Sequence, residues 1–273
     1  LTGCTIAANT STSAGGGIYN IGTCSIAASS ITGNTASSFG GGLANSDSVY
    51  FDVQMTITNT TVSGNTADIG GGIDNGETLT LNACTLERNT ARVQGGGLDN
   101  WSGTTTLNDS TVAQNSAPTG GGISVRVGEV RLDASQVTAN TAEGDSSSGG
   151  GIMNQGGTVT VRNGSGIREN TAGYGAGIYT DTASTVSLAD SQVTANVASR
   201  RGGGINTSGV VDLFSGSMTG NQAAEPGPSG GGILNDGLVN VTPGFTISGN
   251  TPDQCFDNAR LHHLGQYPRP VLR

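Results

Sequence analysis

The chain repeats itself along most of its length, with a period of about 25 residues. Each period carries one asparagine in a similar sequence context. These asparagines are Asn9, Asn34, Asn65, Asn89, Asn115, Asn140, Asn170, Asn196, Asn221 and Asn250. A glycine triplet follows most of them, as at residues 95–97. A fixed period built from short β-type segments is typical of a solenoid, in which each repeat is one coil stacked on the previous one.

The composition also favours a solenoid. Of 273 residues, 47 are glycine and only 4% are aromatic, so the chain has few of the large side chains that fill a wide globular core. A solenoid needs only a narrow column of buried residues. The regular spacing of the apolar positions argues against the alternative for such a composition, a disordered chain.

Three short strands recur within each period. The first follows the glycines and places Ile178 inward, the second is an apolar–polar–apolar triplet such as residues 159–161, and the third precedes the asparagine and places Ile167 inward. The sequence therefore predicts an all-β fold: a right-handed, single-stranded parallel β-helix of triangular section. We expect about ten coils with three short strands per coil.

The asparagine column predicts a ladder at one corner of the triangle. Asparagine tolerates left-handed backbone, and its amide can bond the equivalent amide of the next coil. The expected ladder residues are Asn34, Asn65, Asn89, Asn115, Asn140, Asn170, Asn196, Asn221 and Asn250. The glycine triplets suit corners that need positive φ, or places where neighbouring coils leave no room for a Cβ.

Two regions are expected: a β-helix over residues 1–255 and a tail over residues 256–273 that serves as a cap or an inter-subunit arm. The first coil starts at Leu1 inside a repeat, which is typical of a processed product or a segment of a longer protein. The tail has three arginines and one acidic residue, whereas the whole chain has a net charge of −9. This contrast, with the exposed edges of stacked coils, predicts head-to-tail self-association. The residues expected to take part are Leu1, Cys4, Cys255, Arg260, Arg269 and Arg273.

Several function classes are disfavoured. The acidic balance argues against nucleic-acid binding, which needs a basic surface. No run of 18 apolar residues is present, so no membrane span is expected. The four cysteines are widely spaced and form no CxxC pair, so no zinc site, and no other metal or cofactor, is predicted.

The repeat resembles a known family. Residues 95–100 (GGGLDN) followed by residues 110–115 (STVAQN) are similar to repeats of bacterial secreted parallel β-helix proteins of the pectate-lyase-like superfamily, related to polymorphic outer membrane proteins. The resemblance covers residues 1–255 but lacks the phenylalanine that this family places three residues before the asparagine. It implies an extracellular or surface-exposed β-helix used for adhesion or as a stalk.

Asp74 and Asp99 are the strongest candidates for chemistry. They occupy equivalent outward positions in successive coils, which places them about 5 Å apart, near the separation of a retaining carboxylate pair. Neither histidine nor arginine occupies the same column, and no long loop encloses a cleft.

The leading hypothesis is a non-enzymatic extracellular structural protein: a filament subunit, stalk or adhesin-type β-helix that binds itself and contacts a glycan or host surface. One alternative is a polysaccharide lyase or hydrolase that uses Asp74 and Asp99. Another is a glycan- or ice-binding module, because the third strand has a Thr-rich outer face that charged residues and glutamines interrupt.

Overall fold

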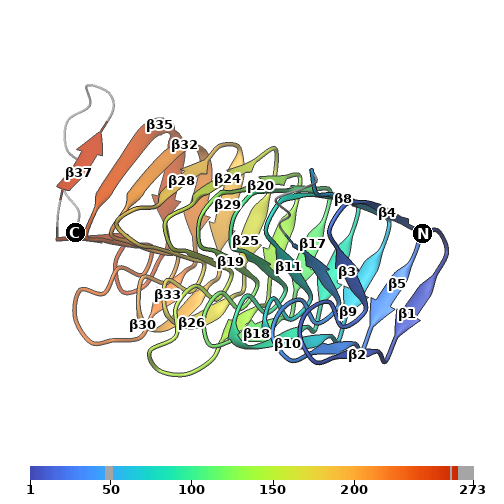
Figure 1. The fold of residues 1–273 in the computed structure, drawn as a ribbon. Helices are drawn as coiled ribbons and strands as arrows, with labels where there is room; N and C mark the ends of the chain where they lie inside the picture. Colours follow the sequence, from blue (N-terminus) through green and yellow to red (C-terminus); the bar gives the residue numbers. More distant parts are fainter. Residues whose placement is uncertain (47–51, 259, 264–273) are drawn as a thin grey trace.

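The protein is an elongated stack of coils, with the first strands (β1 to β5) at one end of the rod and the last described strands (β35 and β37) at the other (Figure 1). The computed structural model describes residues 1–46, 52–258 and 260–263. Over these residues it contains strands and no helix, so it has no helix long enough to cross a membrane. The strands pair in parallel across successive coils and form three sheets. The all-β, three-faced parallel β-helix predicted from the repeat is confirmed.

Sheet I has ten strands: the nine segments that follow the glycines, and one further strand after Gln254. Its strands are β3 (Ile18–Asn20), β7 (Leu43–Asn45), β11 (Ile73–Asn75), β15 (Leu98–Asn100), β19 (Ile123–Val125), β23 (Ile152–Asn154), β27 (Ile178–Thr180), β31 (Ile205–Thr207), β34 (Ile233–Asn235) and β36 (Cys255–Asp257).

Sheet II has eighteen strands and combines the second and third segments of each coil. The second segments are β4 (Thr23–Ala27), β8 (Gln54–Thr58), β12 (Thr78–Asn82), β16 (Thr104–Asn108), β20 (Glu129–Asp133), β24 (Thr158–Arg162), β28 (Thr185–Leu188) and β37 (Arg260–His263). The third segments are β1 (Thr5–Ala7), β5 (Ser30–Thr32), β9 (Thr61–Ser63), β13 (Thr85–Glu87), β17 (Thr111–Ala113), β21 (Gln136–Thr138), β25 (Gly166–Arg168) and β29 (Ser191–Thr194). Two long strands, β32 (Val210–Thr219) and β35 (Leu238–Ser248), span both segments and join them into one sheet.

Sheet III is made of the short segments after the ladder asparagines, to which the sequence analysis assigned no strand. Its nine strands are β2 (Thr10–Ser11), β6 (Thr35–Ala36), β10 (Thr66–Ile69), β14 (Thr90–Gln94), β18 (Ser116–Ala117), β22 (Thr141–Ala142), β26 (Thr171–Tyr174), β30 (Val197–Arg201) and β33 (Gln222–Ala223). Several span only two residues, too few for an alternation of apolar and polar positions to be seen in the sequence.

The asparagine ladder is present and continuous from Asn9 to Asn250. In each step the backbone N–H and the side-chain Nδ2 of one asparagine both donate to Oδ1 of the next, at 2.9–3.0 Å. At the C-terminal end Gln254 takes the place of the next asparagine: its Oε1 accepts from both the N–H and the Nδ2 of Asn250, at 3.1 and 2.9 Å. The ladder therefore ends without losing a hydrogen bond.

The left-handed backbone at this corner lies one residue before the asparagine, which corrects the sequence interpretation. Gly33, Arg88 and Ala139 have φ of 62°, 53° and 54°, and the asparagines that follow them have no positive φ. The asparagine is thus selected for its hydrogen bonds and not for its backbone conformation.

A second ladder, of hydroxyl groups, runs between the two segments of sheet II. The backbone N–H of Ser110 donates to Oγ of Ser135, whose own N–H donates to Oγ of Ser165. Cys84 lies in this column, where its N–H donates to Ser110 Oγ and its Sγ bonds two backbone carbonyls. Cys84 thus serves as a small buried residue among the hydroxyl groups of this column.

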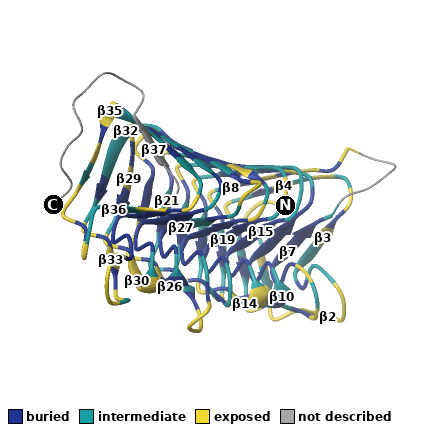
Figure 2. Cartoon of the chain, turned by 90° about the vertical axis from the view of Figure 1, so that its left-hand side faces the viewer, coloured by how far each residue is buried: buried dark blue, intermediate teal, exposed yellow. Residues whose placement is uncertain are grey.

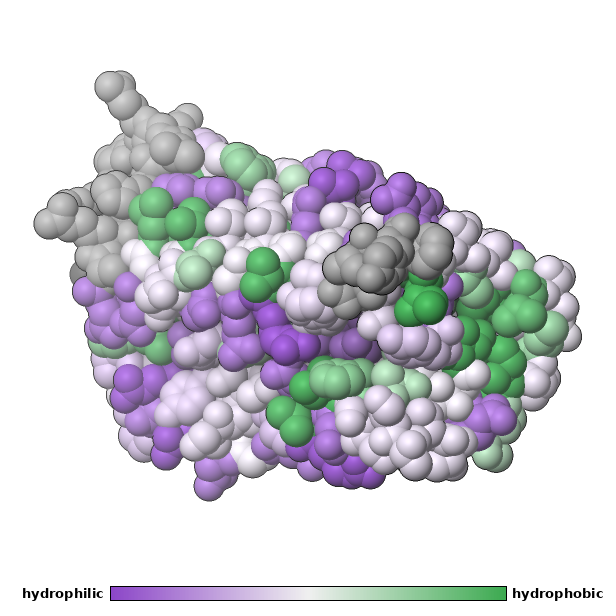
Figure 3. Space-filling view, viewed as in Figure 1, coloured by the Kyte–Doolittle hydropathy of each residue, from purple (hydrophilic) through white to green (hydrophobic). Residues whose placement is uncertain are grey.

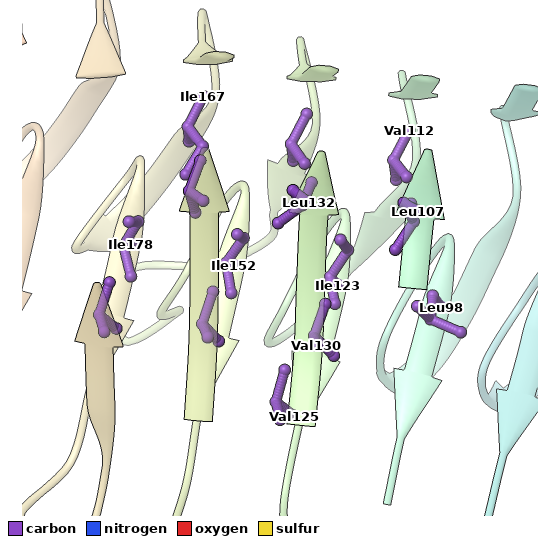
Figure 4. Packing of buried hydrophobic residues seen from close by; sticks show 14 of the residues in the cluster. Leu98, Leu107, Val112, Ile123, Val125, Val130, Leu132, Ile152, Ile167 and Ile178 are labelled. Carbon is purple, nitrogen blue, oxygen red and sulfur yellow. The ribbon is translucent and has the colours of Figure 1, made fainter. Parts of the chain in front are cut away.

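The core is a thin column of aliphatic side chains that stack from coil to coil. Figure 4 shows Ile123, Ile152 and Ile178 aligned in successive coils, opposite inward residues of sheet II such as Leu132. Burial follows the three sheets, and exposed residues concentrate at the turns between strands (Figure 2). Beneath sheet III the buried residues are alanines, which form a cluster of their own: Ala142, Ala172, Ala176, Ala198 and Ala223.

The glycine triplets are required by both causes that the sequence suggested. Gly95 has φ of 68°, a conformation that other residues adopt at a cost. Gly96 has no room for a side chain, because a Cβ there would lie 2.3 Å from the carbonyl oxygen of Gly121 in the next coil. The close approach of successive coils explains why the triplet recurs.

The C-terminal end of the stack extends past the last full coil. Cys255–Asp257 pairs with β34, and Arg260–His263 pairs with β35, both in parallel. The first part of the predicted tail thus adds strands to two of the sheets. Arg269 and Arg273 lie outside the described residues.

Candidate functional site

The outer face of sheet I contains the carboxylate pair predicted from the sequence. Asp74 and Asp99 are register partners in β11 and β15, as the repeat alignment required. The two side chains are nevertheless buried, with exposed fractions of 5% and 0%. The chain turns sharply at the positive-φ Gly95 before β15, so Gln94, which precedes this glycine, lies over Asp99. Asp99 is therefore covered by its own coil.

Two side chains hold the carboxylate of Asp99. Its Oδ1 accepts from Nε2 of Gln94 at 2.8 Å, and its Oδ2 accepts from Nη2 of Arg126 at 2.9 Å. The sequence analysis did not find Arg126, because this arginine follows the end of strand β19 and reaches back one coil to Asp99. Its guanidinium is about one-third exposed, at 34%, and its Nε has no hydrogen-bond partner among the described residues.

Asp74 is the less well hydrogen-bonded member of the pair. Its Oδ1 is buried and has no hydrogen-bond partner within the described part of the chain. Burial, followed by the nearby charge and hydrogen bond of Asp99, raises the pKa of Asp74 well above its usual range, and the positive charge of Arg126 offsets only part of this. The pair therefore places an incompletely hydrogen-bonded carboxyl group beside a second one that is paired with arginine, and both are closed off from solvent.

No metal site is found over residues 1–46, 52–258 and 260–263, where no group of three or more His, Cys, Asp or Glu residues could hold an ion. The cysteines are free thiols. Cys84 is buried, and burial raises the pKa of its thiol. Burial also raises the pKa of Cys255, to about 12.

The residues predicted to mediate assembly lie at both ends of the rod. Leu1 is 58% exposed, and its amino group donates to the carbonyl of Ser25 at 2.7 Å. Cys4 is half-buried, and its Sγ bonds the carbonyl of Thr2. At the far end, Cys255 begins β36 and Arg260 begins β37. The structure places these residues but shows no contact between the two ends.

The N-terminal end of the rod exposes part of the hydrophobic core. Ile6, Ile18 and Cys24 pack against the core but are only partly buried, because no coil lies beyond them among the described residues. Figure 3 shows apolar surface gathered at this end of the molecule. This end is the largest apolar feature of the described surface in that view.

Charged side chains interrupt the Thr-rich outer face of the third-segment strands in sheet II. Glu87 in β13 pairs with Arg88 at 2.8 Å, and Arg168 in β25 donates to Oε1 of Gln136 in β21. The regular array of hydroxyl groups that an ice-binding surface needs is broken in the middle of the rod.

Comparison with known proteins adds no assignment. No family model, curated protein or solved structure matches the chain significantly. The structure therefore carries the assignment of the β-solenoid fold. The family that the sequence resembles stays a prediction.

Proposed function

We propose that the chain is a non-enzymatic structural rod displayed outside the cell, of the stalk, adhesin or filament-subunit kind. The observation that carries the proposal is the asparagine ladder, which runs unbroken from Asn9 to the Gln254 cap. The feature that dominates the sequence thus serves the contacts between coils. A module whose recurring polar residues are used in this way is suited to bearing load and setting distance.

Burial of the carboxylate pair supports a structural role over a catalytic one. A glycosidase acid must reach the glycosidic oxygen, and a nucleophile must reach the anomeric carbon. Asp99 has no exposed surface and is held by Gln94 and Arg126, while Asp74 is 5% exposed. The acid–arginine cluster is better suited to fixing the outer layer of the rod onto sheet I.

The filament form of this proposal keeps the head-to-tail contact expected from the sequence, between an acidic rod and a tail with three arginines and one acidic residue. Contact between unlike ends propagates into an open fibre unless the rotation closes it.

Electron microscopy and light scattering of the purified full chain test this proposal. One subunit corresponds to a rod of about 50 Å, from about ten coils spaced about 4.8 Å apart. We expect rods in whole multiples of this length, shortened by Ile18→Asp at the N-terminal end. Monodisperse single rods would rule out the filament-subunit version of this proposal. Turnover of a polysaccharide that is lost in Asp74→Asn would overturn the structural role itself.

A further inference from the structure

The outer face of sheet I opens into a pocket near the C-terminal half of the rod. Its volume is about 380 Å³, near the lower end of the 300–1,000 Å³ that small-molecule sites commonly have. The floor is formed by Tyr179, Asn206 and Leu234, which are register partners in β27, β31 and β34. These residues occupy the same column as Asp74 and Asp99, several coils further along.

The pocket exists because the covering segment changes in these coils. One wall comes from the segments that precede the glycine triplets and contains Ser148, Tyr174 and Arg201. Over Asp99 the equivalent position holds Gln94, which bonds directly to the column beneath it. In the coil of Asn206 the equivalent position holds Arg201, which makes two hydrogen bonds to Glu225, at 2.7 and 3.1 Å, in place of a bond to the column beneath it. The floor is therefore left open.

The charged groups around the pocket already have partners. Arg201 is neutralised by Glu225, and Asp236 on the opposite wall accepts from Nδ2 of Asn258 at 2.7 Å. Arg200 packs over the ring of Tyr174, 5.5 Å from its centroid, and donates to its hydroxyl. An anionic ligand would have to compete with Glu225 for Arg201, so the lining favours a neutral molecule over an anion.

The uncharged polar groups of the lining are available to a ligand. The side chains of Ser148, Asn206 and Ser208 make no hydrogen bond within the described residues, although Asn206 is 6% exposed. They supply hydroxyl and amide groups that both donate and accept. Beside them lie two tyrosine rings, which offer apolar faces with polar edges. Alternating polar and apolar surface of this kind matches a molecule with hydroxyl groups around a compact ring.

The geometry points to this pocket as a binding site for a neutral saccharide, with the sugar ring against Tyr179 and its hydroxyl groups bonded to Asn206, Ser148 and Ser208. The site is non-catalytic, because the carboxylate pair lies several coils away. It is independent of the proposed rod assembly, and it gives the rod a lateral surface for attachment to a glycan.

An array of neutral and acidic oligosaccharides, followed by calorimetry of the full chain with the best neutral probe, tests the site. Tyr179→Ala and Tyr174→Ala should each weaken binding at least about tenfold, and affinity should change little between low and high salt. The control is Tyr19→Ala, which removes a tyrosine at the same column position in the first coil, outside the pocket. If Tyr179→Ala does not fold, Tyr174→Ala alone decides.

Three results would overturn the inference: no binding to any neutral probe, binding that both pocket variants retain, or binding only to acidic probes with a strong salt dependence. None of them bears on rod assembly, so failure of this site and failure of the structural proposal are distinguishable.

Discussion

Removing one amide from the middle of the asparagine ladder should destabilise the fold far more than removing one at its end. The Asn140 side chain is fully buried and takes part in four hydrogen bonds. Its Oδ1 accepts from the N–H and Nδ2 of Asn115, and its Nδ2 donates to Oδ1 of Asn170 and to the carbonyl of Val112. In Asn140→Ala all four are lost, and the buried N–H of Asn115 loses its acceptor.

The expected loss of stability in Asn140→Ala follows from the number of hydrogen bonds removed. Four hydrogen bonds at about 1 kcal/mol net each, with an added cost of about 1–3 kcal/mol for the orphaned N–H, give on the order of 5 kcal/mol. Asn9→Ala is the matched control, because Asn9 is exposed and its side chain makes one hydrogen bond, from Nδ2 to Oδ1 of Asn34, while its backbone N–H keeps the same acceptor in the variant. It should cost about 1 kcal/mol or less, since water replaces the lost donor.

Guanidinium unfolding followed by circular dichroism measures the difference, provided that the slopes of the transitions agree between variants. If unfolding is not reversible, unfolding rates at fixed denaturant replace the midpoints. A second variant, Asn140→Asp, keeps an acceptor for Asn115 but places another oxygen against Oδ1 of Asn170. Its loss of stability should therefore grow as the pH rises. Equal stability of Asn140→Ala and Asn9→Ala, within about 1 kcal/mol, would refute the ladder's energetic role.

Three further predictions concern single positions. Burial raises the pKa of Asp74 above the value of about 3.9 in an unfolded chain, so its contribution to stability is lost as pH rises toward the folded pKa. Asp74→Asn should therefore flatten the loss of stability with rising pH, and an unchanged pH profile from denaturant titrations would contradict this. Gly96→Ala should destabilise by about 1–3 kcal/mol or more, because its Cβ would lie 2.3 Å from Gly121 O, whereas Gly22→Ala, with open space around it, should be near neutral in thermal unfolding. Cys255, with a pKa of about 12, should react with iodoacetamide at pH 8 much more slowly in the native than in the denatured protein, as mass spectrometry would show; equal rates would count against its burial.

The architecture was predictable because every coil repeats the same constraints. Ile123, Ile152 and Ile178 can be aligned from the sequence alone, and the structure stacks them as expected. The register of Asp74 with Asp99 followed from the same alignment. The strands of sheet III escaped detection because segments such as Ser116–Ala117 are too short to show a period.

The environment of the candidate site was much less predictable. A period-two pattern indicates which residues point away from the core but not what covers them, so Asp99 was expected to be exposed and is buried. Arg126 lies outside the strand columns on which the alignment relies, and its contact with Asp99 depends on the path of a turn. The pocket beside Tyr179 involves the pairing of Arg201 with Glu225 one coil further on, and both residues follow the ladder asparagines, where the sequence showed no periodic pattern.

The cap formed by Gln254 bears on how such a chain changes length. Its Oε1 receives the same two hydrogen bonds as the Oδ1 of an asparagine one coil further on, but it comes from four residues away in the same turn. Termination is therefore encoded locally, and any coil that ends in the usual asparagine could precede it. Duplication or deletion of a whole repeat in the middle of the rod would leave both the ladder and its last step intact. The reach of the molecule can thus vary in coil-sized increments without redesign of its final turn.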